Sequence, residues 1–257
     1  MSQSAKIYVI NLERSKDRLR NIGLQLDTLG LAFERIAAVD GVQLSAEALA
    51  QHYSATLNQQ QMHRQMQAGE IACYLSHRKV WQKMVDDQVP FAVVLEDDVQ
   101  VQPEIALFSQ RVGAVADHWD VIKLFVGPNE KRVEKALSIT PSCSLVANQK
   151  VPTSTAAQMV SLEGARKLLV MSERFGRPVD WDIRRWWQYD LRVLGVSQSL
   201  AEPCEPESTI DKDSGNRKAL NQSVLRKQLL KLQYHIQAKR HGSNAQLLDR
   251  IAKHITD

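Results

Sequence analysis

Three consecutive carboxylates are the strongest chemical signal in the sequence. Glu96, Asp97 and Asp98 directly follow residues 91–95 (FAVVL), an apolar run short enough to be a fully buried strand. In open α/β sheets ligands bind beyond the carboxyl ends of the strands, which is where this triplet stands. Carboxylate oxygens suit Mg²⁺ or Mn²⁺, which complete their shells with water and substrate phosphate oxygens. The triplet therefore predicts a metal and diphosphate site, and an acidic turn without a ligand is the alternative.

Alternating strands and helices are expected to position these carboxylates. Residues 6–11 (KIYVIN) predict the first strand, and Ser15 is placed as the N-cap of a helix that Gly30 ends. The Gln-rich residues 57–67 are interpreted as a mobile loop. We therefore expect an α/β protein with a mostly parallel central sheet. Its other strands are predicted at 33–39, 91–95, 120–126 and 191–196, and its other helices from Ser45, at 70–87, from Pro103 and at 161–174.

Length and composition favour one main domain. A chain of 257 residues with 44% hydrophobic content can bury one substantial core. No run of about 18 apolar residues and no secretory leader pattern is present, so we expect a cytoplasmic protein. Cys73, Cys143 and Cys204 are odd in number and lack metal-ligand spacing, which indicates buried thiols in a reducing compartment.

The basic character is concentrated at the end of the chain. The whole chain carries +4, whereas residues 217–257 hold nine Lys and Arg against two Asp, or +7. This pattern predicts a basic amphipathic helix that lies on an anionic membrane surface. The alternative is a helix that packs its apolar stripe on the main domain. We divide the chain into a domain at 1–213 and a basic helical tail at 214–257. The apolar tail positions are Leu220, Val224, Leu225, Leu229, Leu232 and Ile236.

Blocks along most of the chain together resemble the family 25 glycosyltransferases. This family includes bacterial lipooligosaccharide galactosyltransferases and collagen galactosyltransferase domains. The blocks occur in the family's order, reach Ile210 and leave the tail after Asp213 outside the resemblance. They are YVINL at 8–12 with Arg14 and Arg18, FERIAAVDG at 33–41, GEIACYLSHRKVW at 69–81, FAVVLEDDV at 91–99, SLEGARKLL at 161–169, PVD at 178–180 and ESTI at 207–210.

The resemblance implies a GT-A-like fold and an inverting transfer from a UDP-sugar, most often UDP-galactose. Mn²⁺ or Mg²⁺ at Asp98 would neutralise the charge that builds on the leaving diphosphate. Glu96 is a second metal ligand or the partner of a ribose hydroxyl or a metal-bound water, and Asp97 is expected to turn toward the sugar. The implied acceptor is a saccharide of lipooligosaccharide or lipopolysaccharide, and a lipid-linked acceptor would give the membrane-binding tail a use.

An inverting transfer also needs a base beside the acceptor hydroxyl. The resemblance places Asp180 at the family's acidic position, and Asp182 is the rival two residues later. Both also suit the first turn of a helix for purely structural reasons. His77 lies within a matched block, which favours a role in the site over simple packing.

The loop after the first strand is expected to bind the donor. Asn11, Arg14 and Arg18 stand there, and guanidinium groups pair well with phosphate oxygens at a helix N-terminus. Asp40, at the end of the second strand, is placed to accept hydrogen bonds from uracil or ribose. A solvated helix face for Arg18 and an ordinary Asp-Gly turn for Asp40 are the alternatives.

Two departures from the family pattern affect the predicted specificity. Many relatives have Gly-Thr and then an aromatic residue, where this chain has Ser154-Thr155 and Gln158. Trp181, Trp186, Trp187 and Tyr189 could form a stacking surface for a saccharide, with one of them exposed, although such spacing is more typical of a core.

Other function classes explain the sequence less well. A metal-dependent nucleotidyltransferase or phosphatase would also use carboxylates at a strand end, and it remains the alternative to sugar transfer. A nucleic-acid-binding protein would account for the basic tail but would leave the acidic triplet without a purpose. We expect no nucleic acid partner.

Overall fold

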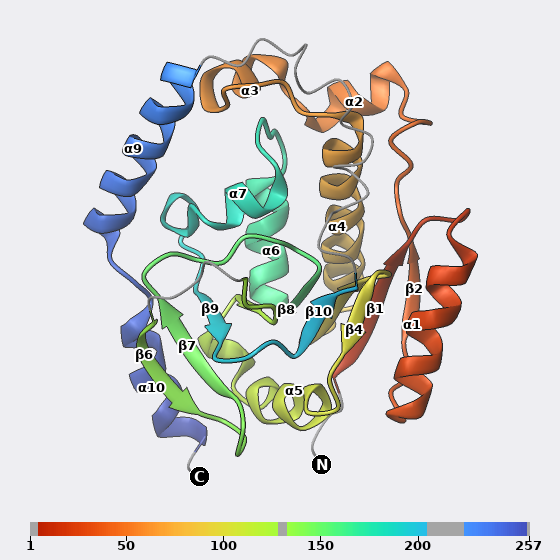
Figure 1. Cartoon of the computed structure of the whole chain (residues 1–257), viewed down its shortest axis with the longest axis vertical. Helices are drawn as coiled ribbons and strands as arrows, with labels where there is room; N and C mark the ends of the chain where they lie inside the picture. The colour runs from red at the N-terminus through yellow and green to blue at the C-terminus, as the bar shows by residue number, and fades with distance from the viewer. Residues whose placement is uncertain (1–4, 128–132, 205–223, 256–257) are drawn as a thin grey trace.

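A mixed eight-stranded sheet forms the centre of the protein. The computed structural model describes residues 5–127, 133–204 and 224–255 (Figure 1). The strand order is β2-β1-β3-β8-β5-β9-β7-β6. Only β8 and β7 run against the common direction in this sheet, so the predicted mostly parallel sheet is confirmed. The strands are β1 (Lys6–Asn11), β2 (Glu34–Ala37), β3 (Phe91–Glu96), β5 (Val121–Lys123), β6 (Val133–Ser138), β7 (Ser144–Asn148), β8 (Ala157–Ser161) and β9 (Val193–Val196).

A short second sheet and a set of helices complete the fold. β4 (Val99–Val101) pairs antiparallel with β10 (Ala201–Pro203) directly after the acidic triplet. The helices are α1 (Lys16–Thr28), α2 (Ala46–His52), α3 (Ala55–Gln61), α4 (Ala68–Asp86), α5 (Ile105–Gly113), α6 (Leu162–Met171), α7 (Val179–Ile183), α9 (Val224–His241) and α10 (Ala245–Ile255), with the short 3-10 helices η1 (Ala116–His118) and η2 (Trp186–Gln188).

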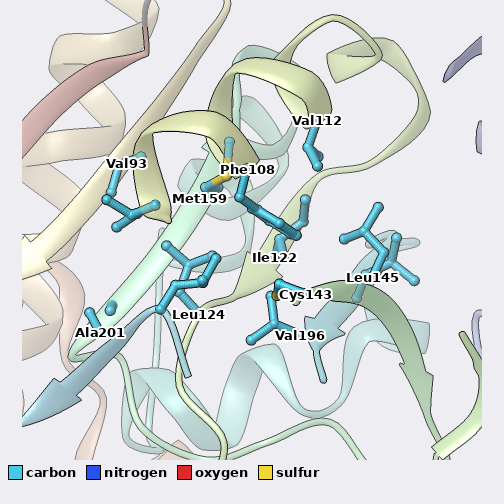
Figure 2. Packing of buried hydrophobic residues seen from close by; sticks show 14 of the residues in the cluster. Val93, Phe108, Val112, Ile122, Leu124, Cys143, Leu145, Met159, Val196 and Ala201 are labelled. Atoms are coloured by element: carbon cyan, nitrogen blue, oxygen red, sulfur yellow. The ribbon is translucent and has the colours of Figure 1, made fainter. Parts of the chain in front are cut away.

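Apolar layers cover both faces of the central sheet. One layer joins the sheet to α1, α5 and α10, and Figure 2 shows Phe108 of α5 among side chains from several strands. The other layer joins the sheet to α4, α6 and α7. Because side chains of a strand alternate between faces, Glu96 continues the row of Ala92 and Val94 and points toward the α4 layer.

Local signals explain why several elements begin and end where they do. The side chain of Ser45 accepts a hydrogen bond from the Ala48 amide and caps α2. The positive φ of Gly30, 67°, follows α1, as its sequence position predicts. Ser15 stands at the N-cap of α1 but makes no side-chain capping bond there.

The prediction of a mobile loop at 57–67 is wrong for residues 57–61. Residues 55–61 form α3, which Ser54 caps by accepting a hydrogen bond from the Leu57 amide. Asn58 is buried, and its Nδ2 donates to the Gly176 carbonyl at 2.8 Å. A tertiary hydrogen bond thus orders a polar sequence that has no apolar periodicity of its own.

Candidate active site

The site forms where β1, β3 and β5 end, and β3 separates two clusters of polar side chains there. The first cluster lies toward α1 and consists of Asn11, Arg18, Asp97 and Asp98; we call it the diphosphate-side cluster after the ligand that the sequence predicts. Asn11 Nδ2 donates to Asp97 Oδ2 at 2.6 Å, while Arg18 lies 3.4 Å from Asp97 Oδ1 and 3.1 Å from Asp98 Oδ2. These contacts bring the end of β1 and the first turn of α1 to the predicted metal carboxylates.

Excess negative charge marks this diphosphate-side cluster. Burial, and then the neighbouring charge of Glu96, raises the pKa of Asp98 to about 6, against the opposing charge of Arg18. Burial also raises the pKa of Asp97, although the hydrogen bond from Asn11 and the charge of Arg18 oppose it. One guanidinium therefore does not balance the adjacent carboxylates. Their hard oxygen atoms and uncompensated charge fit a divalent cation such as Mg²⁺ or Mn²⁺.

The second cluster, called here the buried polar cluster, lies toward α4 and is centred on Glu96. Its Oε1 accepts a hydrogen bond from Thr155 at 2.9 Å and lies 3.3 Å from His77 Nε2. Burial raises the pKa of Glu96, but the hydrogen bond and charge of His77, with Thr155 and the charge of Lys123, outweigh it, so the pKa lies below its usual value. The geometry keeps Glu96 ionised and facing away from the diphosphate-side cluster.

Lys123 and Gln158 also belong to the buried polar cluster, although the sequence analysis did not predict either of them as a site residue. Lys123 ends β5 with 1% of its surface exposed, and its Nζ lies 3.4 Å from Gln158 Oε1. Gln158 Nε2 in turn lies 3.5 Å from His77 Nδ1. The sequence signal that could have identified Lys123 is its position within the apolar run 120–126. A buried strand tolerates a lysine only where polar groups surround its ammonium.

Asp180 and Asp182 have different surroundings, although both belong to α7. Asp180 is half-buried, and burial raises its pKa against the charge of Lys123 and a hydrogen bond from the Ser154 backbone. Asp182 is buried: its Oδ2 accepts from Tyr74 at 3.0 Å and its Oδ1 from Arg177 at 2.6 Å. Asp182 is thus held by hydrogen bonds within the core, whereas Asp180 and Glu96 both lie near the positive charge of Lys123.

Ser154 adopts an unusual backbone conformation at the edge of the buried polar cluster. Its φ is 79°, in the left-handed region that favours glycine. Its hydroxyl accepts a 3.2 Å hydrogen bond from the Ala156 amide. The departure from the family's Gly-Thr therefore falls where the backbone requires a conformation that serine adopts at a cost.

A different set of ligand types meets between α4 and the end of β3. The donor atoms of Cys73, His77 and Glu96 lie within 4.8 Å of one another. Sulfur, nitrogen and oxygen together suit a softer ion than Mg²⁺. Burial, followed by the charge of Glu96, raises the pKa of Cys73 well above its ordinary value, which keeps the thiol protonated. The carboxylates of the diphosphate-side cluster are the better fit to a hard cation.

The remaining predicted site residues lie nearer the surface. Arg14 and Asp40 form an ion pair between the loop after β1 and the loop after β2. Asp40 Oδ1 also accepts a 3.0 Å hydrogen bond from the Val42 amide, so it makes the ordinary turn contact as well. Neither residue contacts the two clusters through a described hydrogen bond.

Two of the four aromatic residues after Asp180, Trp186 and Trp187, contact α9. Trp181, Trp186, Trp187 and Tyr189 are all half-buried, so the expected exposed member is wrong. Trp187 stacks on His241 with ring centroids 5.3 Å apart and lies 5.8 Å from the Tyr234 ring. Contact with α9 accounts for the partial burial of Trp187, whereas Trp186 and Tyr189 also pack against the apolar layer of α4, α6 and α7.

A hollow of about 620 Å³ lies at the opposite edge of the sheet. Ser161, Lys167 and Arg192 are among its lining residues, and no predicted site residue is. Asp120 is buried beside it, 2.9 Å from Lys167 Nζ and 2.6 Å from Arg192 Nη2. These ion pairs join β5, α6 and β9 and have a structural role.

The fold is that of an α/β protein, with the candidate ligand site at the carboxyl edge of a mostly parallel sheet. The chain belongs to glycosyltransferase family 25: residues 4–183 match the model described as "Glycosyltransferase family 25 (LPS biosynthesis protein)". The site residues from Asn11 to Asp180 lie inside this match. A family of glycosyltransferases therefore supplies the framework for interpreting both clusters.

Individual relatives are similar to part of the chain. A "Glycosyltransferase 25 family member" of Aedes aegypti is 35% identical over 172 residues, which cover 63% of this chain and 27% of the relative. "Procollagen galactosyltransferase 2" of Homo sapiens is 29% identical over 185 residues, covering 68% and 29%. The chain thus spans less than a third of the length of these relatives.

Further comparisons give a more distant structure and a relative of doubtful activity. A solved glycosyltransferase involved in glycosylation of the major capsid of PBCV-1 is 9% identical, with a TM-score of 0.46 over 82% of this chain and 98% of that one. A Bos taurus relative, 28% identical over 77% of this chain and 36% of its own, is named "Probable inactive glycosyltransferase 25 family member 3". No helix in the described ranges 5–127, 133–204 and 224–255 is long and apolar enough to cross a membrane.

Proposed function

We propose that this protein transfers a sugar, galactose, from a UDP-sugar to a saccharide acceptor with inversion at the anomeric carbon. The carrying observation is that the family segment gathers Glu96, Asp98 and Asp180 at one edge of the sheet. The relatives named procollagen galactosyltransferase support galactose as the sugar.

The diphosphate-side cluster is proposed to hold the leaving group. Asp98 would hold Mn²⁺ or Mg²⁺. Glu96, predicted from the sequence as a second metal ligand, instead faces His77 and Thr155, so we propose it as the partner of a ribose hydroxyl or of a metal-bound water. When bound, the ion would supply Lewis-acid neutralisation of the diphosphate charge. Arg18, 3.1 Å from Asp98, is placed to pair with a phosphate oxygen. Asn11 fixes the orientation of Asp97, which in this proposal faces the sugar.

Asp180 is proposed as the base on the acceptor side. Its carboxylate takes the proton of the acceptor hydroxyl while that oxygen bonds to the anomeric carbon, and the bond from this carbon to the phosphate oxygen breaks with both electrons leaving on UDP. Lys123 favours the ionised form of Asp180. His77 orients Glu96 through its 3.3 Å contact. Asp182 is engaged by Tyr74 and Arg177, which supports Asp180 for this role.

The outer donor residues and the acceptor complete the proposal. Arg14 and Asp40 are proposed to meet the nucleoside and phosphates when donor binding opens their ion pair. The description of the family as an LPS biosynthesis protein supports a saccharide of lipooligosaccharide or lipopolysaccharide as the acceptor. We place the protein in the cytoplasm, in peripheral contact with the inner face of the membrane, where a lipid-linked acceptor would be presented.

A donor panel tests this function. UDP-sugars are incubated with candidate saccharides, and UDP release and product mass are measured with Mn²⁺, with Mg²⁺ and with chelator. We expect product from UDP-galactose only when both acceptor and metal are supplied. UDP or nucleoside monophosphate release that ignores the acceptor would instead support a phosphatase or nucleotidyltransferase. Absence of turnover with every donor would contradict the proposal and would indicate an inactive protein, as the name of the Bos taurus relative states for that protein.

A further inference from the structure

Helix α9 has two faces of different character. Tyr234 and Ala238 are buried against the protein. On the other side, apolar residues spaced by four, three and four positions form one continuous stripe. We call this the outer stripe; its members are Leu225, Leu229, Leu232 and Ile236, with exposed fractions of 85%, 55%, 57% and 45%.

Specific contacts fix which face of α9 points inward. Arg226 Nε donates to the Met62 carbonyl at 2.9 Å, and the Arg184 guanidinium lies 4.8 Å from the Tyr234 ring centroid. His241 stacks on Trp187 at the far end of the helix. α9 therefore spans from the end of α3 to η2 along one side of the molecule (Figure 1). The apolar stripe of α9 therefore faces outward, whereas the alternative interpretation of the sequence had this stripe packed on the main domain.

The charges of α9 restrict what can cover the outer stripe. The helix contains five Lys and Arg and no Asp or Glu. Lys239 and Arg240 are exposed and follow Ile236 on flanking positions of the helix. A second copy of α9 packed on the stripe would bring these like charges together, which destabilises such a pair. Anionic headgroups above an apolar layer complement both the charge and the stripe.

We propose that the outer stripe of α9 binds the surface of an anionic lipid bilayer. The leucines enter the boundary between headgroups and acyl chains, and the flanking basic side chains contact the headgroups. The attachment is reversible, because a few exposed side chains bury far less apolar surface than a membrane-spanning helix.

The helix that carries this surface lies beside the acceptor side of the site, which its inward face contacts through Tyr234. Arg184, which lies over Tyr234 of α9, follows Asp180 by one helical turn. A bilayer bound at the outer stripe would thus present a lipid-linked saccharide close to the proposed base. This last step rests on the proposed function, whereas binding to the bilayer does not.

Cosedimentation with vesicles tests the proposal on the full chain. Vesicles of phosphatidylcholine alone are compared with vesicles that also contain phosphatidylglycerol, at low and high salt. We expect binding to the anionic vesicles only, weakened by salt. Leu229→Gln with Leu232→Gln, and separately Lys239→Gln with Arg240→Gln, should each lower the bound fraction by about tenfold or more. Glutamine keeps the helix propensity in both variants.

Matched substitutions elsewhere distinguish binding through this surface from nonspecific adsorption of exposed apolar side chains to vesicles. Leu24 of α1 and Val170 of α6 are 60% and 65% exposed, and Leu24→Gln with Val170→Gln should leave vesicle binding unchanged. Thermal melting and transfer to a soluble saccharide should match the unsubstituted protein for all three variants. If the unsubstituted protein shows no transfer, the proposed function is rejected, whereas the vesicle-binding result still tests the membrane proposal. Undiminished vesicle binding of the leucine variant, or a dimer in solution that this variant dissociates, would overturn the proposal.

Discussion

Asn11 at the end of β1 donates a 2.6 Å hydrogen bond to Asp97 at the end of β3. The parallel pairing of these strands, with Ile10 opposite Glu96, brings the two residues to the same edge. Arg35 Nε donates to Asn11 Oδ1 at 2.9 Å, so the amide is held from both sides. The acidic triplet therefore has a fixed orientation before a donor binds.

Asp98→Asn should lower transfer by about 10²-fold or more, because the leaving diphosphate loses a charge that organises its counterion. Removal of one half-buried carboxylate that neighbouring carboxylates repel should leave the melting temperature equal or higher. Initial rates and melting curves of the variant, together with a Mn²⁺ titration of the unsubstituted protein, check this. Full activity in excess chelator would contradict the metal assignment.

Asp180→Asn should leave UDP binding nearly unchanged while transfer falls by about 10²-fold to 10⁴-fold, as expected when a base is lost. Asp182→Asn should instead destabilise the fold by about 3 kcal/mol, since Arg177 would keep a weakened partner in the core. Calorimetric UDP binding, transfer rates and denaturant unfolding distinguish them. A stable Asp182→Asn protein without transfer, beside an active Asp180→Asn protein, would reverse the assignment.

Lys123→Met should reduce transfer by about 10²-fold and also lower the melting temperature, because Glu96 and Asp180 lose their buried counter-charge. The substitution removes the buried cation near Glu96 and Asp180 but retains the apolar stem. Lys79→Met, on the exposed side of α4, is the control and should retain full activity. If Lys123 serves the fold alone, its variant will melt at a lower temperature and keep its specific activity.

Ser154→Gly should preserve or raise the stability, since glycine adopts the 79° φ of this position without steric cost, although the hydrogen bond from the Ala156 amide is lost. Ser154→Val should destabilise by about 1–3 kcal/mol, because a β-branched residue disfavours that conformation strongly. Urea unfolding of both variants provides the measurement. Equal midpoints for valine and glycine would show that the backbone relaxes at this position.

Acidification should weaken the junction between η1 and α10. Burial, followed by the charges of His254 and Arg192, lowers the pKa of His118 below its ordinary 6.5. The unfolded chain then binds this proton more readily than the folded protein, so the contribution to stability is present above about pH 6.5 and is lost as the pH falls through the lowered folded value. Melting temperatures across this range should fall less for His118→Gln. An identical pH profile for the variant would contradict the assignment.

Local patterns were sufficient for the elements that carry the acidic triplet. The run 91–95 followed by three carboxylates corresponds to β3 and its end, and the first predicted strand has the bounds of β1. Both are strongly patterned, since one is continuously apolar and the other is bounded by polar residues. The antiparallel strand β8 was not predicted, because its residues 157–161 continue into the α6 pattern and its direction depends on pairing with β3 and β5.

The partners within the site depend on contacts between distant segments. Lys123 and Gln158 are 35 positions apart, and only the antiparallel register of β5 and β8 sets them opposite each other. The same holds for Asp182, whose neighbours Tyr74 and Arg177 come from α4 and the loop before α7. Sequence spacing left Asp180 and Asp182 equivalent because both lie in the first turn of the same short helix.

By itself the sequence determined the alternating strands and helices, the acidic strand end and the apolar, basic character of the C-terminal segment. Each follows from residue types that are close together in the chain. The tertiary structure alone decided which face of α9 is covered, because the helix offers apolar side chains on both sides. Trp187 and Arg184 contact Tyr234, and this aromatic face packs inward. Leu229 and Leu232 point outward as a consequence, since one helix cannot bury opposite faces against the same surface.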